Sequence, residues 1–302
     1  MQTALECVPC FARQALEAAR VVTDDPVVHE RLLRDVLRTA AEMDLSQCPP
    51  VVAQRIHRTL RELTGVADPY RADRERFNRV ALDLMGELTR LVRRAADPFA
   101  TALRVAIAGN VIDLGVNGTI TEAEILASIR RVMDEPFHGD VDAIRDAVGR
   151  AERILYLADN AGEIVFDRLL IEQLPPGRVT VAVRGGPILN DATRADADVA
   201  GLAEVAEVID NGSDAPGTVL GDCSETFREH YDRADLVIAK GQGNFETLSD
   251  EDASIYFLLK AKCPVIADHV GLPIGTLIVM PWGPWAAGAV QGRGHGTNAA
   301  AG

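Results

Sequence analysis

The fold of this chain is decided by the stretch Ile154-Leu155-Tyr156-Leu157-Ala158-Asp159-Asn160-Ala161-Gly162-Glu163. Its first five residues are apolar and run directly into a carboxylate and an amide, and Gly162 permits a sharp turn after them. A helical pattern of apolar residues, Ile164–Leu174, follows that turn. A buried strand that passes through a tight polar turn into a helix is typical of a parallel sheet with helices on both faces.

The same rhythm continues through the C-terminal half of the chain. Short apolar runs alternate there with amphipathic or acidic stretches, which is the pattern of βαβ units. Besides Ile154–Ala158, we predict strands at Val179–Val183, Glu204–Ile209, Leu236–Ala239, Val265–Ala267 and Leu277–Met280. The fold class that this pattern predicts is α/β.

Helical signals dominate the residues before 136. Asp25-Pro26 places a capping side chain before a proline at the first helical position, and Asp68-Pro69 repeats this signal. Pro50 opens a further amphipathic segment, which Gly65 ends, and Asp97-Pro98 breaks the segment that follows. We therefore divide the chain into a mainly helical N-terminal region (1–135), an α/β domain (136–282) and a disordered tail (283–302).

Composition and charge exclude several classes of protein. The 302 residues are 47% hydrophobic, which suits a globular chain with a core. The formal net charge is −14, so the chain repels nucleic acid and anionic membranes, and we interpret the cluster Arg90, Arg93 and Arg94 as a solvated helix face. No apolar run approaches the ~20 residues of a membrane span, and a signal peptide is not recognisable. We expect a cytoplasmic protein without nucleic-acid or membrane partners, and leave its oligomeric state open.

The cysteines allow more than one interpretation. They are odd in number, which in a chain without a signal peptide favours reduced thiols: Cys7, Cys10, Cys48, Cys223 and Cys263. The first two, with or without Cys48, form a candidate zinc or redox site, or are simply free thiols. His57 is the only nearby fourth zinc ligand, and its spacing does not support that role.

Three strand ends carry polar groups, and ligands of open α/β sheets bind beyond the carboxyl ends of strands. These junctions are Asp159–Glu163, Arg184–Thr193 and Lys240–Asn244. Hard divalent cations prefer carboxylate and amide oxygens, so Asp159, Asn160 and Asp191 are candidate ligands. Each junction also has a simpler interpretation, because turns and helix caps use the same residue types and glycine-rich segments form flexible loops.

Five motifs occur in an order that resembles the damage-control phosphatases, long described as domain of unknown function number eighty-nine: Cys7–Cys10, Ala108–Asp113, Asp159–Glu163, Arg184–Thr193 and Lys240–Glu246. The likeness extends to about Met280, and the N-terminal Cys-x-x-Cys is similar to the prokaryotic branch. This resemblance implies a Rossmann-like three-layer α/β/α domain with a helical N-terminal region. It also implies hydrolysis of phosphorylated sugars or damaged phosphorylated metabolites, supported by Mn, Ni, Co or Mg.

The resemblance also assigns roles to individual residues. Asp159, Asn160 and Asp191 match the metal ligands of the family, and Lys240 matches its lysine near the substrate phosphate. Asn110 and Asp113 match its Asn-x-x-Asp helix, where they would orient substrate or water.

A metal-assisted displacement by water is the mechanism that we expect. Arg184 would join Lys240 in neutralising the phosphoryl oxygens, and either Asp191 or Glu163 would act as the base. Glu163, Ser213 (in the loop Asn211–Thr218) and Asn244 are further candidates for substrate contact. That loop would be either an anion-binding nest or an ordinary turn.

Two other functions remain open at this point. One is an S-adenosylmethionine-dependent carboxyl methyltransferase, although a glycine-rich turn after the first strand is missing. The other is a non-enzymatic sensor of metals or nucleotides.

Overall fold

The computed structural model describes residues 1–109, 127, 129–132, 135 and 137–283. The described residues form a seven-stranded sheet in the order β1-β7-β6-β5-β2-β3-β4, in which only the pair β6/β7 is antiparallel. The strands are β1 (Phe137–Gly139), β2 (Ile154–Leu157), β3 (Val179–Val183), β4 (Glu207–Asp210), β5 (Leu236–Lys240), β6 (Ile255–Lys260) and β7 (Leu277–Trp282). The chain leaves β2 toward β3 and leaves β5 toward β6, so the crevice between β2 and β5 is the topological switch point.

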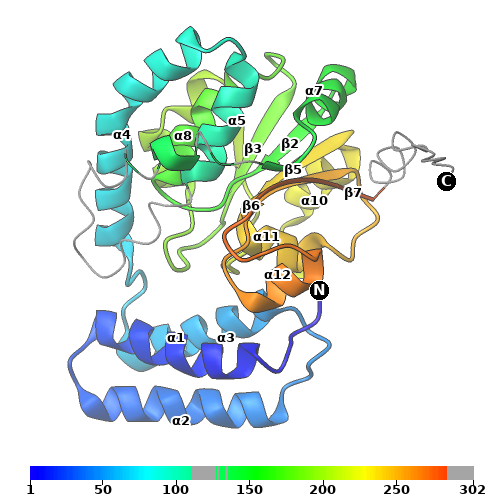
Figure 1. Ribbon diagram of the computed structural model, residues 1–302. Coiled ribbons are helices and arrows are strands. Elements are labelled where there is room, and N and C mark those ends of the chain that lie inside the picture. The colour runs from blue at the N-terminus through cyan, green and yellow to red at the C-terminus, as the bar shows by residue number, and fades with distance from the viewer. Residues whose placement is uncertain (110–126, 128, 133–134, 136, 284–302) are drawn as a thin grey trace, which may run out of the picture.

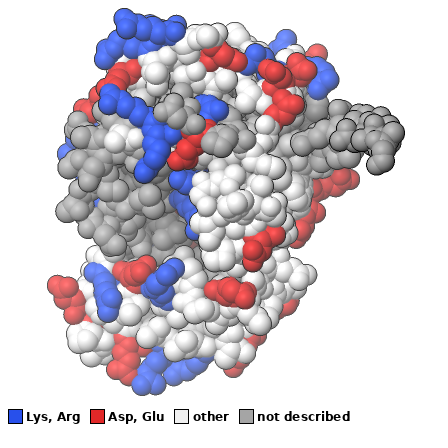
Figure 2. Space-filling view, viewed as in Figure 1, with Lys and Arg blue, Asp and Glu red and all other residues white. Residues whose placement is uncertain are grey.

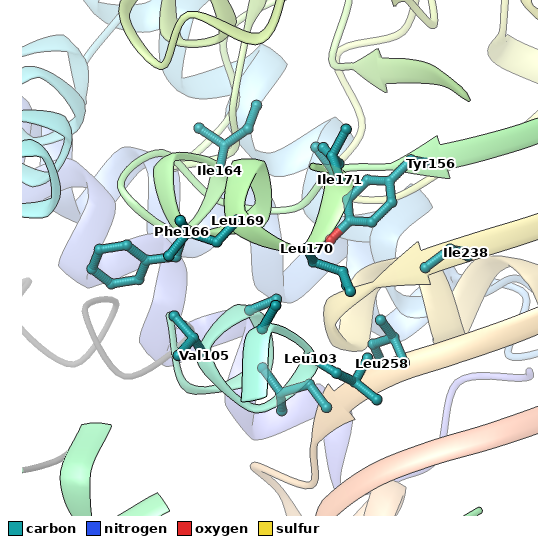
Figure 3. Close-up of a cluster of buried hydrophobic side chains, with 14 of the residues drawn as sticks. Leu103, Val105, Tyr156, Ile164, Phe166, Leu169, Leu170, Ile171, Ile238 and Leu258 are labelled. Carbon is teal, nitrogen blue, oxygen red and sulfur yellow. The ribbon is translucent and has the colours of Figure 1, made fainter. Parts of the chain in front are cut away.

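Helices cover both faces of this sheet (Figure 1). The shorter helices are α7 (Val141–Arg150), α9 (Arg194–Val199), α10 (Glu225–Arg233), α11 (Gly241–Leu248) and α12 (Pro264–Val270). One face packs against α4 (Arg71–Arg94), α5 (Pro98–Ala108) and α8 (Glu163–Ile171) in a core that includes Tyr156 and Ile238, shown in Figure 3. The opposite face carries Leu155 and Leu157 and packs against α10, α11 and α12. Alternate residues of β2 thus serve opposite cores, which confirms the three-layer α/β/α fold.

The first three helices form a separate N-terminal layer with its own core: α1 (Cys7–Val22), α2 (Pro26–Glu42) and α3 (Pro49–Thr64). Their boundaries follow the predicted signals. The Asp25 side chain accepts a hydrogen bond from the Val27 N–H at the start of α2, and Gly65 ends α3 at φ 70°. Figure 1 shows this layer below the carboxyl ends of the central strands.

One acidic residue fastens the N-terminal layer to the α/β domain. Asp214, in the loop after β4, accepts hydrogen bonds from Gln54 Nε2 at 2.7 Å and from the guanidinium groups of Arg58 and Arg61 on α3. By contrast, α4 and α5 pack directly on α8, so the helical region 1–135 divides between two cores. The predicted tail lies outside the described residues from position 284 onward.

One strand prediction is wrong, and two strands, β1 and β6, were not predicted. The predicted strand Val265–Ala267 lies inside α12, because Pro264 occupies the first helical position and Gly271, at φ 69°, ends the helix. The strand β6 was missed, although Ile255–Leu259 is an uninterrupted apolar run that begins with three strand-forming residues. The third predicted strand starts later than expected, at Glu207, because Leu202–Glu204 form a 3₁₀ turn.

The surface and the helix lengths agree with the composition. Basic and acidic side chains are interspersed on the face in Figure 2, and neither sign forms a large continuous patch there. Among the described helices, none combines the length and the apolar character that crossing a bilayer requires.

A buried histidine in the N-terminal layer makes stability depend on pH. His57 packs against Tyr70, and burial together with the charge of Arg61 lowers its pKa from 6.5 to about 4. Between these two values the unfolded chain holds a proton that the folded chain does not, so stability is lost as the pH falls. We expect this histidine alone to lower the free energy of unfolding by about 2 kcal/mol between pH 7 and pH 5. Buried carboxylates such as Asp167 and Glu246 act in the opposite direction, so urea denaturation measures the His57 contribution as the difference between the original chain and a variant without the histidine.

His57→Leu is the variant that tests this effect. It should remove most of the decrease that belongs to this histidine, because leucine has no proton to take up. An equal decrease in the variant and in the original chain would assign the pH dependence to other groups.

Candidate functional site

Two loops meet at the carboxyl end of the central strands and bring the candidate ligands together. The Ala192 N–H donates to the Asp159 carbonyl, and the Ala161 N–H donates to the Asn190 carbonyl, both at 2.8 Å. These bonds make an isolated antiparallel bridge between Asn160 and Asp191. The bridge therefore places three candidate ligands side by side, namely Asp159, Asn160 and Asp191. They come from separate loops, since Asp191 follows Ala161 by 30 positions in the sequence.

The amide of Asn160 has a fixed orientation. Its Nδ2 donates to Asp159 Oδ2 at 2.8 Å and to Glu163 Oε2 at 3.0 Å. Both amide hydrogens are thus directed at carboxylates, and Oδ1 is the atom left to accept or to bind a cation. Asp159, Asn160 and Asp191 all line a cavity of about 490 Å³ between the α/β domain and the N-terminal layer.

Arg184 lies behind these acids and is almost completely buried. Its Nε donates to Asp191 Oδ2 at 2.6 Å, its Nη1 donates to Asn244 Oδ1 at 3.3 Å, and its Nη2 is 3.6 Å from Asp159 Oδ1. Asn244 also accepts from the Thr218 hydroxyl. Neither Arg184 nor Asn244 lines the cavity, so their contact with substrate stays a prediction. In this structure they hold the acids in place.

Lys240 also points away from the cavity. Its ammonium is fully buried and donates to Glu163 Oε1 and Asp167 Oδ1, both at 2.6 Å, and to the Ala106 carbonyl at 2.9 Å. Burial lowers the pKa of Lys240, but the charges of Asp167 and Glu163 outweigh it and raise the pKa above its usual value. Since Glu163 also accepts from Asn160, Lys240 connects to the candidate ligands through that carboxylate. Its contact with a phosphate stays a prediction.

The buried cluster has an excess of negative charge. Among the described residues it contains four carboxylates and two cations: Asp159, Glu163, Asp167 and Asp191 against Arg184 and Lys240. Burial and the charges of Glu163 and Asp191 raise the pKa of Asp159 well above its usual value. A surplus of two negative charges beside oxygen ligands suits a hard divalent cation. The residues present therefore fit the metal that the resemblance implies.

The backbone around the cluster is built for close approach. Leu189 has φ 45°, an uncommon conformation for a residue with a side chain, and it lies on the cavity wall beside Asp191. Gly241, at φ 78°, follows β5, and a Cβ atom at that position would overlap the Asp159 carboxylate. Only glycine allows the start of α11 and Asp159 to come this close.

Gly241→Ala should therefore weaken ion binding at the candidate site as well as strain the backbone. Gly177→Ala is a matched control, because Gly177 has φ 75° and open space where the Cβ would be. We expect both variants to lose about 1 kcal/mol of stability from backbone strain, and only Gly241→Ala to weaken divalent-ion binding, by about 10-fold or more. Calorimetric titration with Mn²⁺ measures the difference, and equal affinities in the two variants would contradict this account.

The remaining candidates fall in different places. Ser213 is buried, and its hydroxyl donates to Asp222 Oδ2 at 2.6 Å. Several N–H groups of its loop already donate to protein acceptors, including those of Gly212, Ala215 and Thr218, which favours the interpretation as an ordinary turn. Asn110 and Asp113 lie outside the described residues.

Polar residues of the cavity wall that were not predicted to be site residues include Lys262, Glu246 and Gln242. Lys262 follows β6 by two residues, lines the same cavity as Asp159, and its charge opposes the rise in the pKa of Asp159. Because β6 was not predicted, the polar residue that follows its carboxyl end was not predicted to belong to the site. Burial raises the pKa of Glu246 from 4.5 to about 7.

The described residues form no competing metal-binding cluster, and a second cavity lies away from the switch point. Within the described parts of the chain, no three His, Cys, Asp or Glu side chains gather at metal-binding spacing; the candidate trio has two carboxylates and an amide. A second cavity of about 510 Å³ lies at the amino ends of β2 and β3, beside Arg153 and Arg178, on the edge of the sheet away from the switch point.

The fold and the site define a Rossmann-like α/β protein with an acidic, oxygen-rich centre at its switch point. The chain belongs to the family of the damage-control phosphatase ARMT1-like domain, whose model matches residues 3–278. It is 35% identical to a damage-control phosphatase of Archaeoglobus fulgidus over 281 residues, which cover 90% of this chain and 96% of that protein. It is also 35% identical to a damage-control phosphatase of Pyrococcus horikoshii over 288 residues, or 93% and 98% of the two chains.

A solved structure shows the same architecture. The crystal structure of a DUF89 family protein from Pyrococcus horikoshii matches with a TM-score of 0.84 and 33% identity, over 93% of this chain and 99% of that one. These likenesses confirm the family that the five motifs indicated. They support a phosphatase, and therefore a hydrolase, role.

Proposed function

We propose that this protein is a divalent-metal-dependent phosphatase that hydrolyses small phosphomonoesters, either sugar phosphates or damaged phosphorylated metabolites. The observation that carries the metal dependence is the surplus of two buried carboxylates beside the amide oxygen of Asn160. Family membership supports the phosphatase chemistry. The cavity of about 490 Å³ suits a small metabolite.

Each residue of the cluster has a role in this proposal. Asp159, Asn160 and Asp191 would hold the ion, which supplies a Lewis acid for a phosphoryl oxygen. Arg184 positions Asp191, and the Lys240–Glu163 pair positions the Asn160 amide. Such supporting contacts commonly contribute 10–100-fold to metal affinity.

Both residues considered for the base are held by neighbouring side chains. Both carboxylate oxygens of Glu163 accept hydrogen bonds, one from Lys240 and one from Asn160. A carboxylate held in this way positions its partners and is poorly placed to take a proton from water. Asp191 lines the cavity, but it accepts from Arg184 and is also a proposed ligand of the ion, so these contacts favour neither residue as the base.

Lys262 is the lysine that we assign to the substrate phosphate. The chain has three lysines, Lys240, Lys260 and Lys262, and of these only Lys262 lines the cavity. It shares that cavity with Asp159, Asn160 and Asp191, where a phosphoryl group would meet the ion. A cation at this point stabilises the negative charge of the phosphoryl oxygens.

Lys262→Met should reduce kcat/KM on the order of 10²-fold, the effect of removing one strong electrostatic donor. Lys260→Met is the matched control and should leave kcat/KM unchanged. A screen of sugar phosphates and phosphorylated cofactor fragments, with EDTA or with Mn²⁺, measures both variants. The proposal predicts hydrolysis that needs the ion, and metal-independent hydrolysis would contradict it.

A further inference from the structure

The loop that carries Asp191 is fastened at its two ends by the α/β domain. At its start, the Gly186 N–H donates to the Ser213 carbonyl at 3.2 Å. At its end, the antiparallel bridge joins Asp191 to Asn160. Residues 187–189 lie between these two attachments, and their contacts are with a different part of the molecule.

The middle of this loop contacts the N-terminal layer. Arg61 Nη1, on α3, donates to the Pro187 carbonyl at 3.1 Å. The Leu189 side chain packs against the core of the layer. Residues 187–189 also line a narrow cleft together with His57 of α3. The N-terminal layer therefore supports the loop at the point between its two attachments to the α/β domain.

Leu189 has a backbone conformation that needs such support. Among the described residues it is the only one besides glycine with a positive φ, at 45°. A residue with a side chain adopts this region at a cost in free energy, so its surroundings have to hold it there. Two contacts do so: the side chain packs against the N-terminal layer, and the carbonyl accepts from Arg74 Nη1 at 3.3 Å.

This conformation is passed to Asp191 through one turn of the backbone. The Asp191 N–H donates to the Ile188 carbonyl at 3.0 Å, which closes a turn with Leu189 inside it. A change of φ at Leu189 would therefore rotate the segment that carries the Asp191 carboxylate. Contacts that orient a ligand contribute to metal affinity because the ligand then needs no rearrangement to bind.

We propose that the N-terminal layer positions the Asp191 carboxylate for the ion and that Leu189 is the positioning residue through which it acts, an inference that rests on the proposed function in taking Asp191 as a ligand. Ion binding and docking of the layer are then linked in both directions. A docked layer raises the affinity for the ion, and a bound ion stabilises the docked layer.

Calorimetric titration of the metal-stripped full chain with Mn²⁺ tests the role of Leu189. Leu189→Gly removes the packing and adopts φ 45° without strain, so it should weaken Mn²⁺ binding about 10-fold. Leu189→Met keeps an apolar side chain of similar size and should keep the wild-type affinity. A role in stability alone would lower the free energy of unfolding of Leu189→Gly and leave its Mn²⁺ affinity unchanged, which would overturn the proposal.

The dependence of hydrolysis on Mn²⁺ concentration gives a second readout. Leu189→Gly should hydrolyse p-nitrophenyl phosphate slowly at limiting Mn²⁺ and regain most of the wild-type rate at saturating Mn²⁺, because its ligands are still present. A rate that stays low at saturating Mn²⁺ would contradict a positioning role.

Arg61 and Arg58 offer a matched pair of variants on α3. Both donate to Asp214, and Arg61 in addition donates to the Pro187 carbonyl. Arg61→Met should therefore weaken Mn²⁺ binding several-fold, whereas Arg58→Met should leave it unchanged. Equal Mn²⁺ affinities in the two variants would exclude the contact with the loop as a support of the ligand.

Hydrogen exchange of the full chain measures the linkage in the reverse direction. Added Mn²⁺ should slow amide exchange in α1–α3 as well as around Asp159 and Asp191, and Leu189→Gly should reduce the slowing in the layer. Protection confined to the ligand loops would overturn the linkage and leave the ion site standing. A wild-type chain that binds no Mn²⁺ would instead remove both the ion site and the positioning role.

Discussion

Asp159→Asn is expected to reduce Mn²⁺-dependent hydrolysis on the order of 10²–10³-fold, because it removes a charged ligand from the point where the substrate phosphate gains its stabilisation. The change keeps the size of the side chain and alters its charge only. Ion binding should weaken in parallel, since Asp191 and Asn160 alone leave a neutral amide and one carboxylate.

The same variant should be more stable than wild type when metal is absent. The Asp159 carboxylate is buried, and Glu163 and Asp191 raise its pKa well above the usual value, so the ion-free fold carries an unfavourable charge. Its removal should raise the free energy of unfolding on the order of 1 kcal/mol, the equivalent of one pKa unit. Asp198→Asn, at an exposed position of α9, is the control for both measurements. Lower stability of ion-free Asp159→Asn would contradict the charge surplus.

Lys240→Met is expected to cost about 3–5 kcal/mol of stability, measured by urea denaturation at pH 7. The lysine is fully buried between Glu163 and Asp167, and its removal leaves two carboxylates without a counter-ion. Methionine retains most of the apolar stem, so the loss reports the charge.

The pH dependence of the stability loss in Lys240→Met distinguishes the loss of a counter-ion from a packing defect. Burial raises the pKa of Asp167 to about 6 even with Lys240 present, so the folded chain binds protons more readily than the unfolded chain does, and acid favours folding. Without Lys240 the Asp167 carboxylate protonates at higher pH, because the lysine charge lowers its pKa, and the deficit of Lys240→Met should shrink as the pH falls toward 5. The double variant Lys240→Met/Asp167→Asn should recover part of the loss. A deficit that is constant with pH would point to packing.

Much of the fold and the gathering of the acids could be predicted because both follow from periodicity. Apolar runs of β2, β3 and β5 end in polar groups, and parallel strands bring their carboxyl ends to one edge. The structure indeed places Asp159, Asn160 and Asp191 together, while their role as metal ligands stays a prediction.

The side to which the Lys240 side chain points could also have been predicted from the sequence. Side chains alternate along a strand, and Ile238 of β5 belongs to the core under α5 and α8. Lys240, two residues further, has to point to the same face, where Glu163 and Asp167 receive it. A polar residue at a strand end is therefore a cavity residue only if its register allows it.

Other errors arose because local patterns were ambiguous. The run Val265–Ala267 is apolar and β-branched, but Pro264 and Gly271 mark a short helix, and three residues are too few for periodicity to decide. Missing β6 hid Lys262, which the strand-end rule would have found. The meeting of the N-terminal layer and the α/β domain at the cavity depends on tertiary packing that no local pattern encodes.

The central claim is that Asp159, Asn160 and Asp191 hold a divalent ion that hydrolysis needs. Electron paramagnetic resonance of added Mn²⁺ measures this most directly, because bound and free ions are distinguished in the metal-stripped protein. We predict a tightly bound ion in wild type whose occupancy tracks the rate of p-nitrophenyl phosphate hydrolysis, and its loss in both Asp159→Asn and Asp191→Asn. Unchanged Mn²⁺ affinity in either variant would contradict the account.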